Sequence, residues 1–338
     1  MDRRRILVAS DSFKGTYSSL EVAQLVKENL SEDEYEVDVM EVSDGGEGFC
    51  HALTESLGGE YVSLRVHDPL MRTIASSYGI KDETAIIEIA KASGLTLLQP
   101  HEYDPWNASS FGTGELLVHA IRKGCRKFIV GLGGSATSDC GRGMLEALRD
   151  IPEIQDCEFL IASDVQNPLC GPQGAARVFA PQKGADQALV ERLEERTLML
   201  GRELERKCGK NLMNTPGAGA AGGLGAAFLS LHNSHIQSGI DLVLDAQHFE
   251  ERVRKADLVL TGEGRIDSQT LLGKAPYRIA LRAAQVHVPC VALYGQMTLS
   301  PEEQAQSPWS GFHPVGQIGN FSTALHALFL PPYQSKTR

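Results

Sequence analysis

The chain has 338 residues, with 32 Lys and Arg against 43 Asp and Glu, which gives a formal net charge of −11. This acidic balance excludes nucleic acid and anionic lipid as main partners, because both require a basic protein face. The length suits about two domains, and a hydrophobic content of 42% is enough to build their cores.

Short apolar segments alternate along the chain with longer amphipathic ones, which is typical of α/β proteins with mostly parallel sheets. Strands are predicted, in chain order, at 6–9, 35–42, 127–131, 158–163, 257–261 and 288–294. Helices are predicted at 19–30, 113–122, 143–149, 186–207, 222–231 and 276–285. Residues 61–98 instead alternate apolar and polar side chains around turn residues, which predicts an antiparallel patch.

Cysteine usage and hydropathy indicate where the protein resides. The seven cysteines are scattered without the two-residue spacing of a zinc or redox motif, which indicates reduced thiols. The apolar segment 6–9 is too short for a signal peptide. Residues 211–240 carry no charged side chain, but Pro216 and a run of glycines exclude a membrane span. We therefore expect a cytoplasmic protein that has no membrane partner.

Acidic residues follow five of the predicted strands, each within a turn rich in Gly or Ser: Asp11, Asp44, Asp139, Asp164, and Glu263 with Asp267. For a single acid, a helix cap or a turn is the more common role. Five acids at the carboxyl ends of strands favour a ligand site, because open α/β sheets bind ligands at that edge. With Lys14, Arg265 and the glycine turns, they suit phosphoryl transfer, in which acids hold Mg²⁺ and accept a proton while backbone N–H groups bind phosphate.

Two glycine motifs have different contexts. Residues 131–136 (GLGGSA) follow a predicted strand and precede a predicted helix, so their N–H groups could face an anion. They do not form a Walker A loop, and Thr137 stands where a nucleophile elbow needs glycine. Residues 217–222 (GAGAAG) match the dinucleotide fingerprint but follow no strand, which disfavours an NAD enzyme.

Several further side chains have both a functional and a structural interpretation. His232 and His235 could bind a metal, but a pair on a helix surface is favoured because no third ligand is near in sequence. Lys183 and Lys274 lie in turns with glycine and proline, and they are candidate contacts for phosphate or carboxylate as well as solvated loop lysines.

Eight motifs occur in a fixed order over residues 6–295: DSFKG at 11–15, DGGEG at 44–48, GLGGSAT at 131–137, DVQNPL at 164–169, FAPQKGA at 179–185, PGAGAAGGLG at 216–225, SGID at 238–241 and TGEGRIDSQT at 261–270. Together they resemble the type-1 glycerate kinase family. The resemblance implies ATP- and Mg²⁺-dependent phosphorylation of D-glycerate at its 2-hydroxyl, giving 2-phosphoglycerate and ADP. The partners would then be the two small molecules, glycerate and ATP, and a homodimer stays open as the oligomeric state.

The fold class that the resemblance implies is α/β with two domains. A discontinuous Rossmann-like parallel-sheet domain would comprise 1–65 plus 290–338. A second α/β domain, flavodoxin-like and carrying the glycine loops, would be inserted at 66–289. The active site would lie in the cleft between the two domains.

Residue roles follow from placing these motifs in a kinase reaction. Asp164 or Asp44 would accept the hydroxyl proton, and Lys14 or Arg265 would hold the glycerate carboxylate. Mg²⁺ would be held by Asp139, Glu263 and Asp267. ATP would be bound by Gly131, Gly133, Gly134, Ser135, Ala136, Thr137 and Lys183.

The sequence departs from the family pattern beside the predicted site. Only residues 151–158 join the helix at Gly143 to the strand that precedes Asp164, where family members carry a longer segment. Two alternatives therefore stay open. One is a kinase for another small hydroxy acid or sugar acid, since GLGGSA is also similar to the phosphate loop of the galactokinase–homoserine kinase superfamily. The other is a binding protein that has lost catalysis.

Overall fold

The computed structural model describes residues 3–13 and 16–315. The chain divides into two compact units. Unit 1 combines Met1–Ser43 with Val243–Arg338, and unit 2 is the continuous stretch Asp44–Leu242. Among the described residues, no helix has both the length and the apolar character that a membrane crossing requires.

These unit boundaries differ from the predicted ones, 1–65 plus 290–338 and 66–289. Strand pairing explains the difference. Glu60–His67 pairs antiparallel with Thr73–Lys81 and so belongs to the sheet of unit 2. Leu258–Ile266 pairs with strands of unit 1, although it was predicted to lie in the insertion.

The described residues of unit 1 form a five-stranded parallel sheet. Its strands are β1 (Arg4–Val8), β2 (Tyr35–Val39), β9 (Leu258–Ile266), β10 (Cys290–Met297) and β11 (Gly311–Pro314). They lie in the order β11-β10-β9-β1-β2. Counted within the unit this order is 2-1-3-4-5, that of flavodoxin-like sheets, so the flavodoxin-like order that we expected in the inserted part lies in unit 1.

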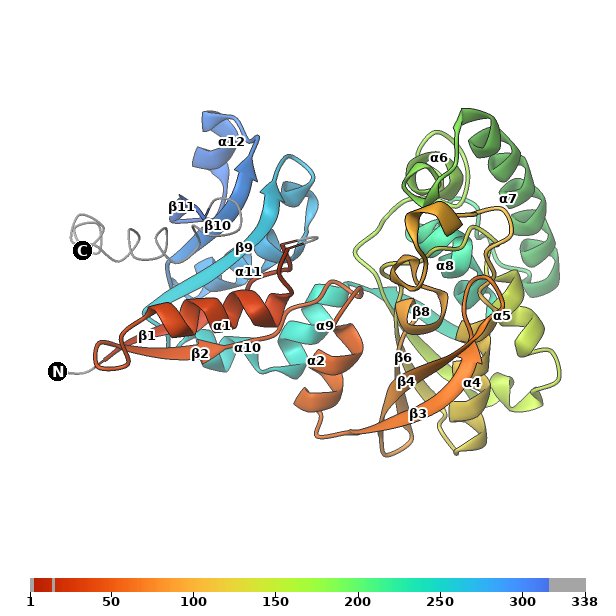
Figure 1. Ribbon diagram of the computed structural model, residues 1–338, viewed down its shortest axis with the longest axis horizontal. Helices are drawn as coiled ribbons and strands as arrows, with labels where there is room; N and C mark the ends of the chain where they lie inside the picture. The colour runs from red at the N-terminus through yellow and green to blue at the C-terminus, as the bar shows by residue number, and fades with distance from the viewer. Residues whose placement is uncertain (1–2, 14–15, 316–338) are drawn as a thin grey trace. The chain divides into compact units, whose positions relative to one another are not determined.

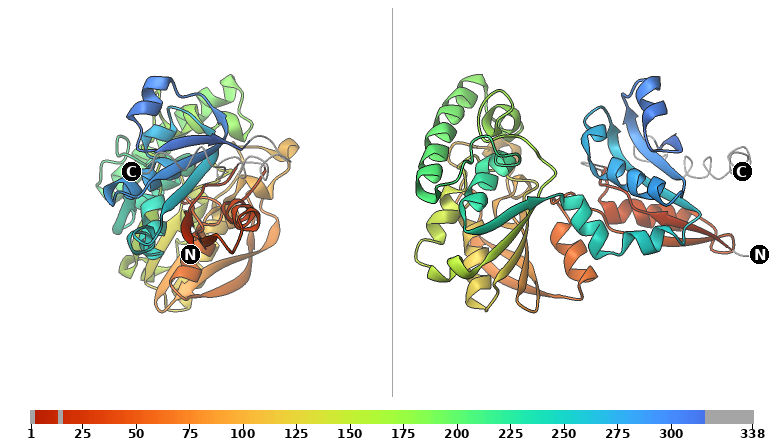
Figure 2. Two further views of the ribbon diagram at one scale, coloured as in Figure 1. Left: turned by 90° about the vertical axis from the view of Figure 1, so that its left-hand side faces the viewer. Right: turned by 180° about the vertical axis from the view of Figure 1, so that it is seen from behind.

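Helices cover both faces of this sheet. Helix α1 (Ser19–Asn29) lies on one face, and α10 (Phe249–Val253) and α11 (Ala275–Gln285) lie on the other (Figures 1 and 2). A capping box between Ser18 and Glu21 begins α1. Its buried face packs with apolar side chains of β1, β9 and β10, among them Ile6, Leu260 and Val291. A short helix, α12 (Pro301–Gln306), precedes β11.

Unit 2 contains a six-stranded mixed sheet whose strands follow chain order. They are β3 (Glu60–His67), β4 (Thr73–Lys81), β5 (Thr84–Glu88), β6 (Lys127–Gly131), β7 (Glu158–Ala162) and β8 (Asn233–Gln237). The pairs β3–β4 and β4–β5 are antiparallel, which confirms the predicted antiparallel patch. The strands from β5 to β8 run parallel. The predicted α/β class with two largely parallel sheets is therefore confirmed.

Eight helices accompany this sheet in the described chain. They are α2 (Phe49–Ser56), α3 (Ala90–Ser93), α4 (Phe111–Arg122), α5 (Arg142–Ala147), α6 (Ala175–Phe179), α7 (Gln187–Cys208), α8 (Ala220–Ser230) and α9 (Gly239–Ala246). The rings of Phe128 and Phe159 stack in the core of this unit, with their centroids 5.0 Å apart. Helix α9 starts in unit 2 and ends in unit 1, because the boundary follows Leu242.

Two sequence features have a definite outcome in this fold. The preference for His232 and His235 as a pair on a helix surface is wrong, because His235 lies in strand β8 opposite Leu160. His232 lies in the turn that precedes this strand. The short segment before β7 is ordered as a 3₁₀ helix, Pro152–Asp156. It buries Ile154 in the core of unit 2.

Candidate active site

A glycine-rich loop, Gly131–Thr137, begins at the last residue of β6, at the carboxyl edge of the parallel strands of unit 2. Backbone hydrogen bonds fix it on several sides. The N–H of Leu132 donates to the carbonyl of Ala162 at the end of β7, and the N–H of Gly133 donates to the carbonyl of Gly45. A side chain on Gly133 would overlap the backbone of Gly46, so glycine is required there.

The available donors in this loop are fewer than predicted. Gly133 and Ala136 already donate their N–H groups, to the carbonyls of Gly45 and Ser93 respectively. Within the described chain, the N–H groups of Gly134 and Ser135 have no protein acceptor. Gly134 is exposed and adopts a positive φ of 71°. The loop therefore offers the two adjacent donors of Gly134 and Ser135 for an anion.

The side chain of Lys183, from a distant part of the chain, is buried against the same loop. It is only 2% exposed, and its Nζ donates to Ser135 Oγ at 2.8 Å and to the carbonyl of Thr137 at 2.6 Å. Burial lowers the pKa of this amine to about 7, while the negative charge of Asp139 opposes the shift.

Asp164 follows β7, the strand next to the one that leads into the loop. Its carboxylate accepts the N–H of Ile240 at 3.2 Å and a hydrogen bond from the Ser238 hydroxyl. Burial raises the pKa of Asp164 to about 6, and the negative charges of Asp44 and Asp241 add to the rise. Such a carboxylate is ionised near neutral pH but poised to take a proton.

Asp44 lies at the start of unit 2, on the same sheet edge. It is exposed, and its Oδ1 accepts the N–H of Gly46 at 3.1 Å. Gly239 packs directly against its backbone, because a Cβ at Gly239 would overlap the carbonyl oxygen of Asp44. The charge of Asp44 raises the pKa of Asp164, so the two candidate proton acceptors lie near one another.

Asp139 differs from the other acids. Its Oδ2 accepts the N–H and the hydroxyl of Ser110 and the N–H of Gly143, and its Oδ1 accepts the N–H of Gly141. These donors lie at the start of α5 and of α4, so the carboxylate ties two helix N-termini together. The predicted metal role does not suit a carboxylate with four donors, and the cap that we considered more common for a single acid is what the structure contains.

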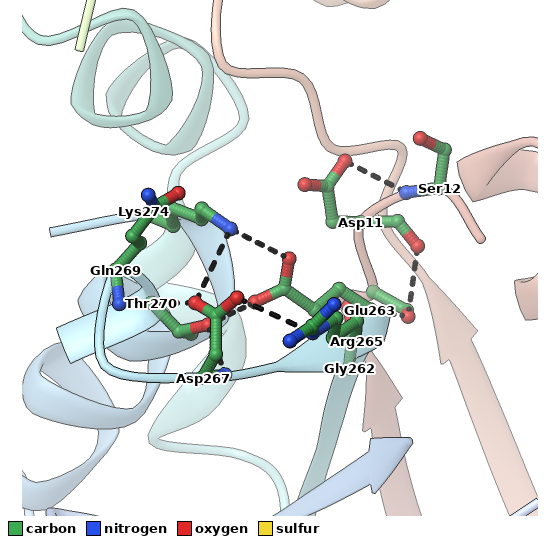
Figure 3. A network of polar contacts seen from close by, with 10 residues as sticks. Asp11, Ser12, Gly262, Glu263, Arg265, Asp267, Gln269, Thr270 and Lys274 are labelled. Carbon is green, nitrogen blue, oxygen red and sulfur yellow. Dashed lines mark hydrogen bonds and ion pairs between the residues drawn. The ribbon is translucent and has the colours of Figure 1, made fainter. Parts of the chain in front are cut away.

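The acids of unit 1 form a second cluster at the end of β9 (Figure 3). Glu263 is 8% exposed, and its Oε1 accepts the hydroxyl of Thr270 at 2.6 Å. The same hydroxyl accepts the N–H of Asp267 at 3.0 Å. Burial raises the pKa of Glu263, whereas Thr270 and Lys274 oppose the rise.

Two cations face these carboxylates. Lys274 Nζ lies 3.4 Å from Glu263 Oε2 and 4.0 Å from Asp267 Oδ1, which places the ammonium between the two acids (Figure 3). Arg265 Nε lies 3.6 Å from Asp267 Oδ2, and its side chain is 61% exposed. Arg265 is therefore the more accessible of the two cations for an incoming anion.

Asp11 belongs to the same cluster. Its N–H donates to the carbonyl of Gly262, and its Oδ1 accepts the N–H of Ser12 at 2.7 Å. This contact joins the segment after β1 to β9, the neighbouring strand (Figure 3). Lys14, predicted to hold a substrate carboxylate, lies outside the described residues.

The predicted acids thus divide between two sheets. Asp11, Glu263 and Asp267 lie at the carboxyl edge of the sheet in unit 1, and Asp139 and Asp164 lie at that edge in unit 2. Periodicity alone could not distinguish one edge from two, because every strand ends in the same local pattern.

Two residues near Asp164 had no predicted role, although their motif was noted. The Ser238 hydroxyl donates to Asp164 and accepts the N–H of Asp241 at 3.3 Å. The spacing of Ser238 and Asp241 is that of a helix N-cap and an acid in the first turn, a signal that could have placed the start of α9.

These two clusters contain the groups that phosphoryl transfer requires. Unit 2 provides free backbone donors for phosphate and a carboxylate with a pKa near neutrality. Unit 1 provides two carboxylates, Glu263 and Asp267, on either side of the Lys274 ammonium, and the accessible guanidinium of Arg265.

Comparisons with known proteins agree with this chemistry. The chain matches the model of the glycerate kinase family over residues 6–151 and 149–327. A protein named glycerate kinase from Halalkalibacterium halodurans is 37% identical over 324 residues, covering 86% of this chain and 85% of that protein. A protein named glycerate 2-kinase from Escherichia coli is 37% identical over 327 residues, covering 87% and 86%.

A solved structure is similar over nearly its whole length. This protein of Salmonella typhimurium LT2, provisionally named glycerate kinase 2, superimposes with a TM-score of 0.77 at 34% identity, covering 96% of this chain and 94% of that one. The two stretches matched by the family model meet at residues 149–151, where the bridge before β7 is short. Fold, motif order and overall similarity agree, and the chain is therefore a kinase that belongs to the glycerate kinase family.

Proposed function

We propose that this protein transfers the γ-phosphoryl group of ATP to the 2-hydroxyl of D-glycerate in the presence of Mg²⁺, giving 2-phosphoglycerate and ADP. The observation that supports this most is the position of Asp164. Its half-buried carboxylate follows β7, while the two free N–H groups of Gly134 and Ser135 follow the neighbouring strand β6.

In this proposal Asp164 accepts the proton of the attacking hydroxyl. The N–H of Ile240 and the hydroxyl of Ser238 hold the carboxylate in one orientation. A pKa of about 6 leaves it ionised at neutral pH, so it can act as a general base. Asp44, which is more exposed, holds its Oδ1 against the N–H of Gly46 and contributes negative charge beside the base.

The loop Gly131–Thr137 binds the phosphates of ATP through its free backbone donors. N–H groups aimed at an anion stabilise the charge that develops on the transferred phosphoryl group. Gly131, Gly133 and Ala136 shape the loop through packing and backbone hydrogen bonds rather than through contact with ATP.

The carboxylates of Glu263 and Asp267 fit Mg²⁺, which in kinases is commonly bound by one or two carboxylates together with phosphate oxygens. Both already face a shared cation, the ammonium of Lys274. The bound ion would neutralise charge on the phosphates. Arg265 binds the carboxylate of glycerate, since a guanidinium forms paired hydrogen bonds with a carboxylate. Asp139 keeps a structural role in this proposal.

The test measures ADP release from purified protein with Mg-ATP and D-glycerate, and then offers the product to enolase. Enolase consumes 2-phosphoglycerate but not its 3-phospho isomer. We expect phosphoenolpyruvate to appear without added phosphoglycerate mutase. Phosphoenolpyruvate that appears only after mutase is added would overturn the 2-position.

The same assay separates the alternatives. ADP release with another hydroxy acid or sugar acid, but not with glycerate, would replace the substrate. If no acid gives ADP while glycerate still raises the Tm, the protein binds glycerate without phosphorylating it.

A further inference from the structure

Lys183 occupies an uncommon position for a lysine. It ends a 3₁₀ turn, Pro181–Lys183, and its ammonium or amine is buried inside the glycine loop. Its two acceptors, Ser135 Oγ and the Thr137 carbonyl, lie on either side of Ala136. One amino group therefore links Ser135, which presents one of the two free N–H groups, to Thr137.

The number of acceptors matches a neutral amine. A neutral lysine has two N–H bonds, whereas a charged ammonium has three donors. Within the described chain, Lys183 Nζ has two acceptors, and both are uncharged oxygens. A charged Lys183 would therefore bury one donor without an acceptor, which is costly in a dry interior.

The charges around Lys183 leave it without an ion pair. Asp139 acts on it through space, but the carboxylate oxygens of Asp139 accept bonds from Ser110, Gly141 and Gly143. Arg196 of α7 donates to the Ser138 carbonyl. Tyr103 packs against the backbone of the next residue, Gly184. Among the described residues, no carboxylate lies within ion-pair distance of Lys183.

We propose that Lys183 is a positioning residue that takes up a proton when the phosphate groups of a nucleotide occupy the loop Gly131–Thr137. Phosphate would add a second negative charge, besides that of Asp139, to the surroundings of this amine and so favour its charged form. The proton comes from solvent, and no covalent bond changes. The inference rests on the proposed function, because it requires a nucleotide at this loop.

The direction of the pH dependence follows from this linkage. In the empty protein Lys183 has a pKa of about 7, and a bound anion raises it. Between pH 7 and the higher pKa of the complex, binding is accompanied by proton uptake, so ADP affinity falls as the pH rises. Below pH 7 the lysine is protonated before and after binding, and this contribution to the pH dependence disappears.

The experiment is calorimetric titration of the full chain with ADP at pH 8 in two buffers of different ionisation enthalpy. At that pH the phosphates of free ADP are fully ionised, so uptake reports on the protein. For the wild type we expect an uptake of about 0.5 to 1 proton per ADP. Lys183→Met should bind ADP with an uptake near zero. Lys207→Met is the matched control, because Lys207 is exposed and paired with Glu203, and it should behave as the wild type.

Each outcome decides the matter. Equal proton uptake by the wild type and Lys183→Met would overturn the inference and leave the proposed function intact. If Lys183→Met does not fold, the wild type alone gives the answer, since its ADP affinity should fall by up to about tenfold per pH unit above pH 7. A flat profile overturns the inference. If the wild type does not bind ADP, the inference fails, and the ADP-release assay shows whether the kinase proposal fails with it.

Discussion

At the scale of single residues, the acids of this protein differ by what donates to them. Asp139 receives four hydrogen bonds at the starts of two helices, which leaves it a structural carboxylate. Asp164 receives fewer donors and is desolvated, so its pKa rises to about 6. Identical side chains thus acquire different chemistry from their surroundings.

Replacing the proposed base tests this distinction. Asp164→Asn should lower kcat by about 10²-fold or more, because an amide cannot accept the hydroxyl proton. In the wild type, kcat should fall as the pH drops through about 6, since protonation removes the base. The residual activity of the variant should lack this acid limb. Kinetics at several pH values give both results.

Asp156→Asn is the control, because Asp156 is exposed on the bridge before β7. It should retain wild-type kcat. An unchanged kcat in Asp164→Asn would remove Asp164 from the mechanism and make Asp44 the candidate base.

At the scale of elements, strand ends and helix starts combine to build the site. The glycine loop is fixed by backbone bonds to Gly45 and Ala162, so its two free donors keep their direction. Helix α9 begins where Ser238 both accepts the N–H of Asp241 and donates to Asp164. The same hydroxyl therefore orders a helix and tunes a carboxylate.

Ser238→Ala separates these two effects. Loss of the hydroxyl removes a hydrogen bond that lowers the pKa of Asp164, so that pKa should rise. The acid limb of the kcat profile should move up by about 0.5 to 1 pH unit, the equivalent of one lost hydrogen bond. Stability should fall by about 1 kcal/mol through loss of the cap.

Ser300→Ala is the matched control, since Ser300 caps α12 in a capping box with Glu303. It should lose similar stability without moving the pH profile. A profile shift of equal size in both variants would show that the effect comes from stability rather than from Asp164.

At the scale of the whole molecule, the chain forms two units, each with its own sheet and its own buried core. The predicted functional groups occur on both. The phosphate loop and the proposed base belong to unit 2, whereas the paired acids and Arg265 belong to unit 1.

Arg265→Met tests the contribution of unit 1. We expect the KM for glycerate to rise by about 10- to 100-fold, as for the loss of a charged hydrogen bond to a carboxylate. The Kd of ADP, measured without Mg²⁺, should not change, because the proposal assigns Arg265 to glycerate and the phosphates to the loop Gly131–Thr137. Steady-state kinetics with glycerate and calorimetry with ADP measure the two quantities.

Arg254→Met, at an exposed arginine of the same unit, should leave both quantities unchanged. If Arg265→Met weakens ADP binding as much as it raises the KM, Arg265 acts on the nucleotide rather than on the glycerate carboxylate.

The sequence by itself determined the local patterns: β-strands followed by acids, the GLGGSA loop after a strand, the antiparallel segment and the order of motifs that identifies the family. Each of these patterns involves residues close together in the chain or their order along it, so each can be found in the sequence alone. Only the tertiary structure decided that β9 pairs with β1, that Asp139 ties together two helix starts, and that Lys183 lies inside the glycine loop. Those outcomes depend on contacts between segments far apart in sequence, whose burial and donors set the chemistry of each side chain.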